Sequence, residues 1–101
     1  MKPFPVVYLK RAQNDLEEIL AYIERDRPEA AARWIETLDK RLGRLARYPN
    51  SGCIPKDDRL AGQGFRLLVF GDYLAFYRIR PRRVEIVRVL HGSRRWSFLL
   101  P

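Results

Sequence analysis

The stretch Phe65–Trp96, FRLLVFGDYLAFYRIRPRRVEIVRVLHGSRRW, decides the fold because it predicts three successive β-strands. Gly71 and Asp72 form a two-residue hairpin signal, in which glycine supplies the positive φ angle of a type II′ turn. Pro81 and Arg82 predict a second turn, since proline fixes φ at the first central position. We therefore expect a three-stranded antiparallel unit.

The two turns set a strand register, and the register assigns each side chain to one face of the sheet. The first turn pairs Leu67 with Phe76, and the second pairs Phe76 with Val87. One face is then the more continuously apolar, and we expect it to form the core. Its residues are Arg66, Leu68, Phe70, Tyr73, Ala75, Tyr77, Ile79, Val84, Ile86, Arg88 and Leu90. Because an isolated buried charge is costly, Arg66 and Arg88 are expected either to extend their charged ends to solvent or to pair with helix acids such as Asp15, Glu18 or Glu36.

The opposite face of the sheet is apolar at one end and basic at the hairpin tip. A face of this kind is typically covered only in part by its own chain, so we expect it to bind a partner. Its apolar residues would contribute affinity, and its arginines would raise the association rate. The candidate partner-binding residues are Leu67, Val69, Leu74, Phe76, Arg78, Arg80 and Arg83.

The preceding residues predict one strand and two helices. A β-prone run at residues 4–9 begins with prolines, which favours a sheet edge. Apolar residues then recur at helical spacing over about residues 10–25 and from Pro28 to about Tyr48, as in an antiparallel helix hairpin. Residues 50–63 predict an irregular loop. The expected fold class is α+β, with a β-α-α-β-β-β order, the hairpin packed on a mostly antiparallel sheet, and residues 1–101 forming a single domain.

Composition and charge narrow the function classes. The chain has 101 residues and a net charge of +8, and residues 60–101 hold eight arginines against two acids. This half favours an anionic partner, either nucleic acid or an acidic polypeptide, although a solvated basic surface is the simpler alternative. With Cys53 and His91 as the single cysteine and histidine, we expect no disulfide, metal or cofactor. No apolar run reaches the roughly 18 residues of a membrane span, and no signal peptide is evident, so a cytoplasmic protein is expected.

Five segments together resemble, in order and spacing, the RelE/ParE superfamily of bacterial type II toxins. They are DLEEILAYI, PEAAARWIETL, YPNSG, FRLLVFGDYLAFYRI and VEIVRVLHGSRRW, and they are most similar to the ParE branch. The resemblance implies a small toxin fold and a hetero-oligomer with an acidic, ParD-like antitoxin. It also implies one of two activities, because the RelE branch cleaves messenger RNA on the ribosome and the ParE branch poisons DNA gyrase. The sequence departs from the usual pattern at the RPRR turn and at SRRW after His91-Gly92.

Chemistry favours gyrase inhibition over RNA cleavage. A ribonuclease must activate the 2′-hydroxyl, stabilise the developing phosphorane charge and protonate the leaving oxygen. The positions that match the basic residues of RelE-like nucleases are apolar here, namely Leu67, Val69 and Leu74. We therefore expect no catalytic residue. The candidate target contacts are His91, Arg94, Arg95 and Trp96.

Two alternatives stay open at this point. The first is a ribosome-dependent mRNA endonuclease in which His91 acts as base or acid. The second is a non-toxic module that keeps only antitoxin binding. In all three interpretations the partner-binding residues of the opposite face are candidate antitoxin contacts.

Overall fold

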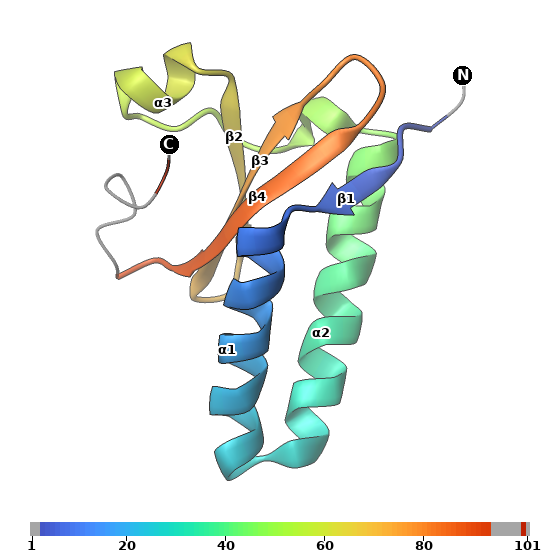
Figure 1. The fold of residues 1–101 in the computed structure, drawn as a ribbon, viewed down its shortest axis with the longest axis vertical. Coiled ribbons are helices and arrows are strands. Elements are labelled where there is room, and N and C mark those ends of the chain that lie inside the picture. The colour runs from blue at the N-terminus through green and yellow to red at the C-terminus, as the bar shows by residue number, and fades with distance from the viewer. Residues whose placement is uncertain (1–2, 94–99, 101) are drawn as a thin grey trace.

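A computed structural model of the chain describes residues 3–93 and 100, and it contains one four-stranded sheet. The strand order is β1-β4-β3-β2, with two long helices packed against one face of the sheet (Figure 1). The edge strand β1 (Val6–Tyr8) runs parallel to β4 (Val84–His91). Between β4 and the other edge strand, β2 (Phe65–Phe70), lies β3 (Tyr73–Ile79), antiparallel to both. The predicted α+β class and element order are confirmed.

Helices α1 (Lys10–Asp26) and α2 (Pro28–Gly43) form the predicted antiparallel hairpin. Pro28 occupies the first turn of α2, where a missing backbone N–H costs nothing. A 3-10 turn at Arg44–Ala46 follows, so the regular α-helix ends before the predicted limit at Tyr48. The apolar stripes of both helices are buried against the sheet. The main core contains Ala12, Leu16, Leu38, Leu42, Leu45, Ala75, Tyr77, Val84, Ile86 and Val89. No helix in the described part of the chain is long and apolar enough to cross a membrane.

The first β-hairpin has the predicted register, with Leu67 opposite Phe76. Gly71 adopts a φ of 57° in its turn, a backbone conformation that glycine reaches without steric cost. The second hairpin begins as predicted but shifts by one residue between Phe76 and Tyr77, so that Phe76 lies opposite Arg88. The predicted pairing of Phe76 with Val87 is therefore wrong beyond this β-bulge.

The bulge reverses the face assignment of the last residues of β4. Val89 packs in the main core with the helices, although it was assigned to the opposite face. Leu90 packs on the opposite side, although it was assigned to the core. One inserted residue is sufficient for this reversal, because successive side chains in a strand point to opposite faces.

The two arginines assigned to the core face have different partners. Arg88 donates from Nε and Nη2 to the Asp15 carboxylate of α1 at 2.8 and 2.9 Å. This confirms a helix acid as its partner, and the bonding from Asp15 raises the pKa of Arg88. Arg66 instead donates to the backbone carbonyl oxygens of Asn50 and Gly52. Of the two predicted alternatives, pairing with a helix acid is therefore wrong for Arg66, because its guanidinium reaches the loop beside it.

A second, smaller core covers the opposite face of the sheet. The segment predicted as irregular contains a short helix, α3 (Asp58–Gly62), whose Leu60 is fully buried. Asp57 caps this helix by accepting the backbone N–H groups of Arg59 and Leu60. The second core contains Leu60, Phe65, Phe76, Val87, Leu90 and Leu100. More of this face is therefore covered than the sequence indicated.

Candidate functional site

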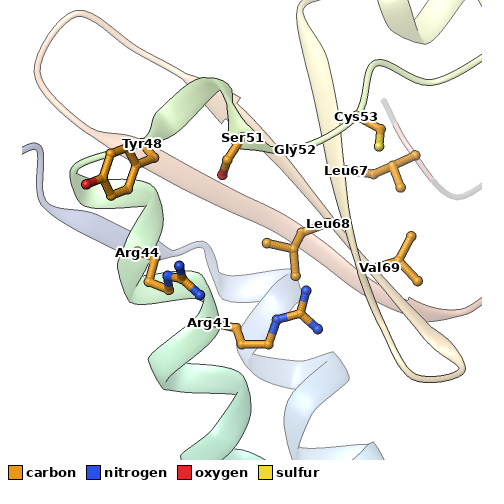
Figure 2. Close-up of a pocket in the computed structure, with 9 residues that line it drawn as sticks. All are labelled: Arg41, Arg44, Tyr48, Ser51, Gly52, Cys53, Leu67, Leu68 and Val69. Atoms are coloured by element: carbon orange, nitrogen blue, oxygen red, sulfur yellow. The ribbon is translucent and has the colours of Figure 1, made fainter.

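A cleft of about 540 Å³ lies between the C-terminal end of α2 and the edge strand β2 (Figure 2). Its floor is apolar and comes from β2, while its helix side carries two arginine side chains and an exposed tyrosine. The lining residues are Arg41, Arg44, Tyr48, Ser51, Gly52, Cys53, Leu67, Leu68 and Val69. This lining contains no carboxylate, so the cleft favours an anionic or mixed apolar and anionic ligand.

One wall of the cleft, residues 49–53, is attached to the sheet by side chains of β2 and β3. The Tyr77 hydroxyl donates to the carbonyl oxygen of Pro49 at 2.7 Å and accepts the N–H of Gly52 at 2.9 Å. Arg66 donates to the carbonyl oxygen of Gly52 at 2.9 Å. A phenol is protonated at neutral pH, and burial raises the pKa of Tyr77 still further from neutrality, so the hydroxyl can donate this hydrogen bond. The wall is therefore held in place before any ligand binds.

The outer edge of β2 is open at one position beside this cleft. Cys53 and Leu67 exchange both backbone hydrogen bonds at 2.8 Å, so the N–H and C=O of Leu67 point away from β3. Two residues further on, Val69 directs its own N–H and C=O to the same side, by the alternation of a strand. Val69 is 51% exposed, and it lies beyond the point at which Cys53 closes the edge.

The helix side of this cleft is not among the residues that the sequence predicts as contacts. Arg41 and Arg44 lie on the solvent side of the α2 region, three residues apart, where basic residues usually serve only as solvated charges. The one local signal was the accumulation of arginine and lysine in residues 40–47 without an acid, next to an exposed Tyr48.

The structure separates the predicted antitoxin contacts into different environments. Val69 is exposed and lines the cleft. Leu67 and Leu74 are half-buried and pack against the second core. Phe76 is fully buried in that core, so it supports the surface from beneath and offers no area to a partner in this conformation.

The three predicted arginine contacts lie at the β3–β4 end of the sheet, where two of them bind the buried Glu85 carboxylate. Arg80 donates to Glu85 at 3.3 Å, and Arg83 donates to the same carboxylate from Nε at 2.8 Å. Burial alone would raise the pKa of Glu85, but the bonds from Arg83 and Arg80 hold it below its usual value. Arg78 instead stacks over the Phe65 ring at 3.9 Å. Because Glu85 offsets part of their charge, these arginines offer less positive charge than their number implies.

The predicted target-contact end begins at His91, the last residue of β4. Its Nδ1 accepts the backbone N–H of Ser93 at 3.1 Å and lies 2.7 Å from the Ser93 hydroxyl. Its ring meets Tyr73 edge-to-face at a centroid distance of 5.3 Å. His91 also borders a smaller recess of about 170 Å³ that Glu18 and Tyr22 of α1 help to line. Arg94, Arg95 and Trp96 lie outside the described residues.

Comparison with known sequences identifies relatives over most of the chain. The family model described as the ParE toxin of the type II toxin–antitoxin system parDE matches residues 6–96. The Sinorhizobium fredii protein Y4kP, provisionally named a toxin, is 41% identical over 92 residues, which cover 89% of this chain and 90% of that protein.

Solved structures show the same architecture. The chromosomal ParDE toxin–antitoxin system of P. aeruginosa matches with a TM-score of 0.74 at 17% identity, over 87% of this chain and 95% of that chain. The RelBE2 toxin–antitoxin complex of Mycobacterium tuberculosis matches with a TM-score of 0.60 at 27% identity, over 88% and 98% respectively. The chain therefore belongs to the ParE toxin family of type II toxin–antitoxin systems, within the RelE/ParE superfamily.

Proposed function

We propose that this toxin inhibits DNA gyrase and that an acidic, ParD-like antitoxin neutralises it. Membership of the ParE family supports the toxin class, and the similarity of FYRI and RVLHGSRRW to the ParE branch supports gyrase as the target. The toxin acts by binding, with His91 and the basic residues after it as the contact to gyrase or to its DNA.

The choice of gyrase over messenger RNA depends mainly on the side chains at the positions that match a nuclease centre. Leu67 and Leu74 pack against the second core, and Val69 is an exposed aliphatic residue. None of the three can transfer a proton or bind a phosphate. The Nδ1 atom of His91 is engaged by Ser93, which favours a turn-capping role over proton transfer to RNA.

The antitoxin part of the proposal is supported by charge and by the solved relatives. Both matched structures come from toxin–antitoxin systems. This chain has a net charge of +8, so a partner that binds its exposed surface is favoured if it is acidic. An acidic segment would gain association rate from the arginines and affinity from exposed aliphatic residues.

The target is tested by two assays run side by side with the purified toxin. One measures supercoiling and trapped cleaved DNA with gyrase, and the other measures ribosome-dependent cleavage of messenger RNA. We expect loss of supercoiling with trapped DNA, and a weaker effect for Arg94→Ala with Arg95→Ala. The matched control removes two exposed arginines of the helix hairpin, Arg25→Ala with Arg33→Ala, and should retain inhibition.

Cleaved messenger RNA with unaffected gyrase would overturn the proposal in favour of the nuclease alternative, and His91 would then be the first residue to mutate. A non-toxic module is distinguished by growth. Induction of the toxin without any antitoxin should stop growth, and continued growth at full expression of folded protein would contradict toxin activity.

A further inference from the structure

We infer that the outer edge of β2 at Val69, with the cleft beside it, binds an extended acidic segment of the antitoxin as an added strand. This inference rests on the proposed antitoxin partner and assigns that partner to the edge of the sheet. The sequence predicts that the antitoxin binds the face of the sheet. Phe76 of that face is fully buried, so it offers no contact area to a partner.

The backbone of β2 provides the main-chain part of this site. The N–H and C=O of Val69 point outward, and no backbone partner occupies them among residues 3–93 and 100. An extended peptide can satisfy both groups by pairing with this position. Because Cys53 already closes the edge at Leu67, the added strand must run alongside Val69 toward the Gly71 turn, and it is therefore short.

The two sides of the β2 edge differ in chemistry, and they specify the side chains of the added strand. Figure 2 shows Leu68 directed toward α2 and Arg41, while Leu67 and Val69 point to the other side. Alternate residues of an added strand follow the same two directions. Residues on the helix side would reach Arg41 and Arg44, which bind carboxylates through planar guanidinium forks. Residues on the other side would contact exposed aliphatic surface.

The arginines of this cleft are positioned for such a segment. The Arg41 guanidinium lies 5.6 Å from the centre of the Phe70 ring, so it is held close to the end of β2. Neither Arg41 nor Arg44 forms an ion pair with an acidic residue in the part of the chain that the structure describes. A partner carboxylate would therefore meet uncompensated positive charge.

Other occupants fit this surface less well. A second copy of the toxin, paired edge to edge, would bring Arg41 and Arg44 of both copies together and oppose two chains of net charge +8. A nucleic acid strand would satisfy the arginines but would leave the aliphatic floor and the outward backbone groups of Val69 without suitable partners. An acidic polypeptide satisfies all three features.

The exposed thiol of Cys53 provides a reporter for the cleft, since it lies in the lining of the cleft and next to the open edge. The sample is the toxin, alone and copurified with the product of the open reading frame adjacent to the toxin gene as the candidate antitoxin. Formation of the complex should slow the hydrogen exchange of the Val69 amide by about tenfold or more. It should slow the labelling of Cys53 by a maleimide by about tenfold as well.

Charge reversal tests the arginines. Arg41→Glu with Arg44→Glu should weaken antitoxin binding by about 100-fold in a titration. The control Arg25→Glu with Arg33→Glu makes the same change in net charge on the helix hairpin and should stay within about threefold of the wild type. Val69→Pro removes the outward N–H while leaving the β2–β3 ladder intact, and it should weaken binding in a protein that remains folded.

Four results would overturn the inference. A complex with unchanged exchange at Val69 and unchanged Cys53 labelling would place the antitoxin elsewhere while leaving the antitoxin proposal intact. Binding of a single-stranded oligonucleotide that is lost on reversal of Arg41 and Arg44, with antitoxin affinity unchanged, would assign the cleft to nucleic acid. Sedimentation as a dimer that dissociates with Val69→Pro would assign the edge to a second copy. Failure of the two gene products to form any complex would refute the antitoxin proposal itself, and this inference with it.

Discussion

Replacement of Gly52 by alanine tests whether the wall of the cleft is as tightly held as its contacts indicate. A Cβ atom at this position would lie 2.4 Å from the Tyr77 hydroxyl oxygen and 2.7 Å from the carbonyl oxygen of Leu67. Neither neighbour can move freely, because Tyr77 is fully buried and Leu67 is tied to Cys53 by two backbone hydrogen bonds. The loop must therefore shift away from the sheet.

The expected cost follows from these contacts. Overpacking of a close-packed site costs about 1–3 kcal/mol. The shift also breaks the hydrogen bond from Gly52 N–H to Tyr77, which contributes about 0.5–1.5 kcal/mol. A total loss of about 2–4 kcal/mol is a large part of the roughly 5–15 kcal/mol that stabilises a domain of this size. The melting temperature should fall by roughly 10–30 °C.

Urea and thermal denaturation of Gly52→Ala and Gly43→Ala, followed by circular dichroism, measure this cost against a matched control. Gly43 is the last residue of α2, and a Cβ atom there would meet nothing within 4 Å, so alanine should stabilise the helix by about 0.5–1 kcal/mol. The two substitutions should thus have opposite signs. A free energy of unfolding for Gly52→Ala within about 0.5 kcal/mol of the wild type would refute the reasoning.

Three further predictions concern the core and the buried charges. Leu38→Ala should lower the free energy of unfolding in urea by about 2–5 kcal/mol, since Leu38 is fully buried between the helices and the sheet. Asp15→Ala removes the acceptor of Arg88 and of the Val89 N–H and should cost about 2–4 kcal/mol, and a loss under about 0.5 kcal/mol would contradict a buried pair. Because the pKa of Glu85 is lowered in the fold, its contribution is present above its unfolded pKa and is lost as pH falls through the folded one. Glu85→Gln should therefore flatten the loss of stability between neutral and acidic pH, and an unchanged slope would contradict this.

The first hairpin could be predicted from the sequence because independent local signals agree there. The Gly71 turn fixes the pairing, and the alternation of apolar and polar residues supports the same faces. The helices were equally accessible, since their apolar stripes recur over several turns and Pro28 marks where the second one begins. Their observed limits differ from the predicted ones only at the ends, where helical patterns carry the least information.

The bulge in β4 could not be predicted from that strand alone. The residues from Val84 to Leu90 are all buried, so both registers place apolar side chains on both faces. The deciding residue lies far away in the sequence. Asp15 is only one of three helix acids that the sequence offers to Arg66 and Arg88, yet it is buried and accepts hydrogen bonds from both Arg88 and Val89. A contact between residues so distant in the chain leaves no trace in local periodicity.

The cleft was missed for a related reason, since its parts come from three separate segments. Arg41 and Arg44 resemble ordinary helix surface, and the segment around Cys53 resembles an ordinary loop. Hydrogen bonds from Tyr77 and Arg66 hold that loop against the sheet. Both donors are assigned to the core face from the sequence, so neither indicates a contact with the loop. The sequence did offer Val69 as a candidate contact, but it could not indicate that the edge beside it would be open.

The second core also decides which surface remains for a partner. The bulge turns Val89 toward the helices and Leu90 to the opposite side, so β4 supplies apolar residues to both cores. The second core, with Leu60 from α3, buries Phe76 and part of the face on which the sequence predicts partner binding. The outer edge of β2 is covered only in part, because Cys53 pairs with Leu67 while the outward N–H and C=O of Val69 have no backbone partner in the described part of the chain. The partner surface that we propose is therefore the edge of the sheet beside Arg41 and Arg44, and not its face.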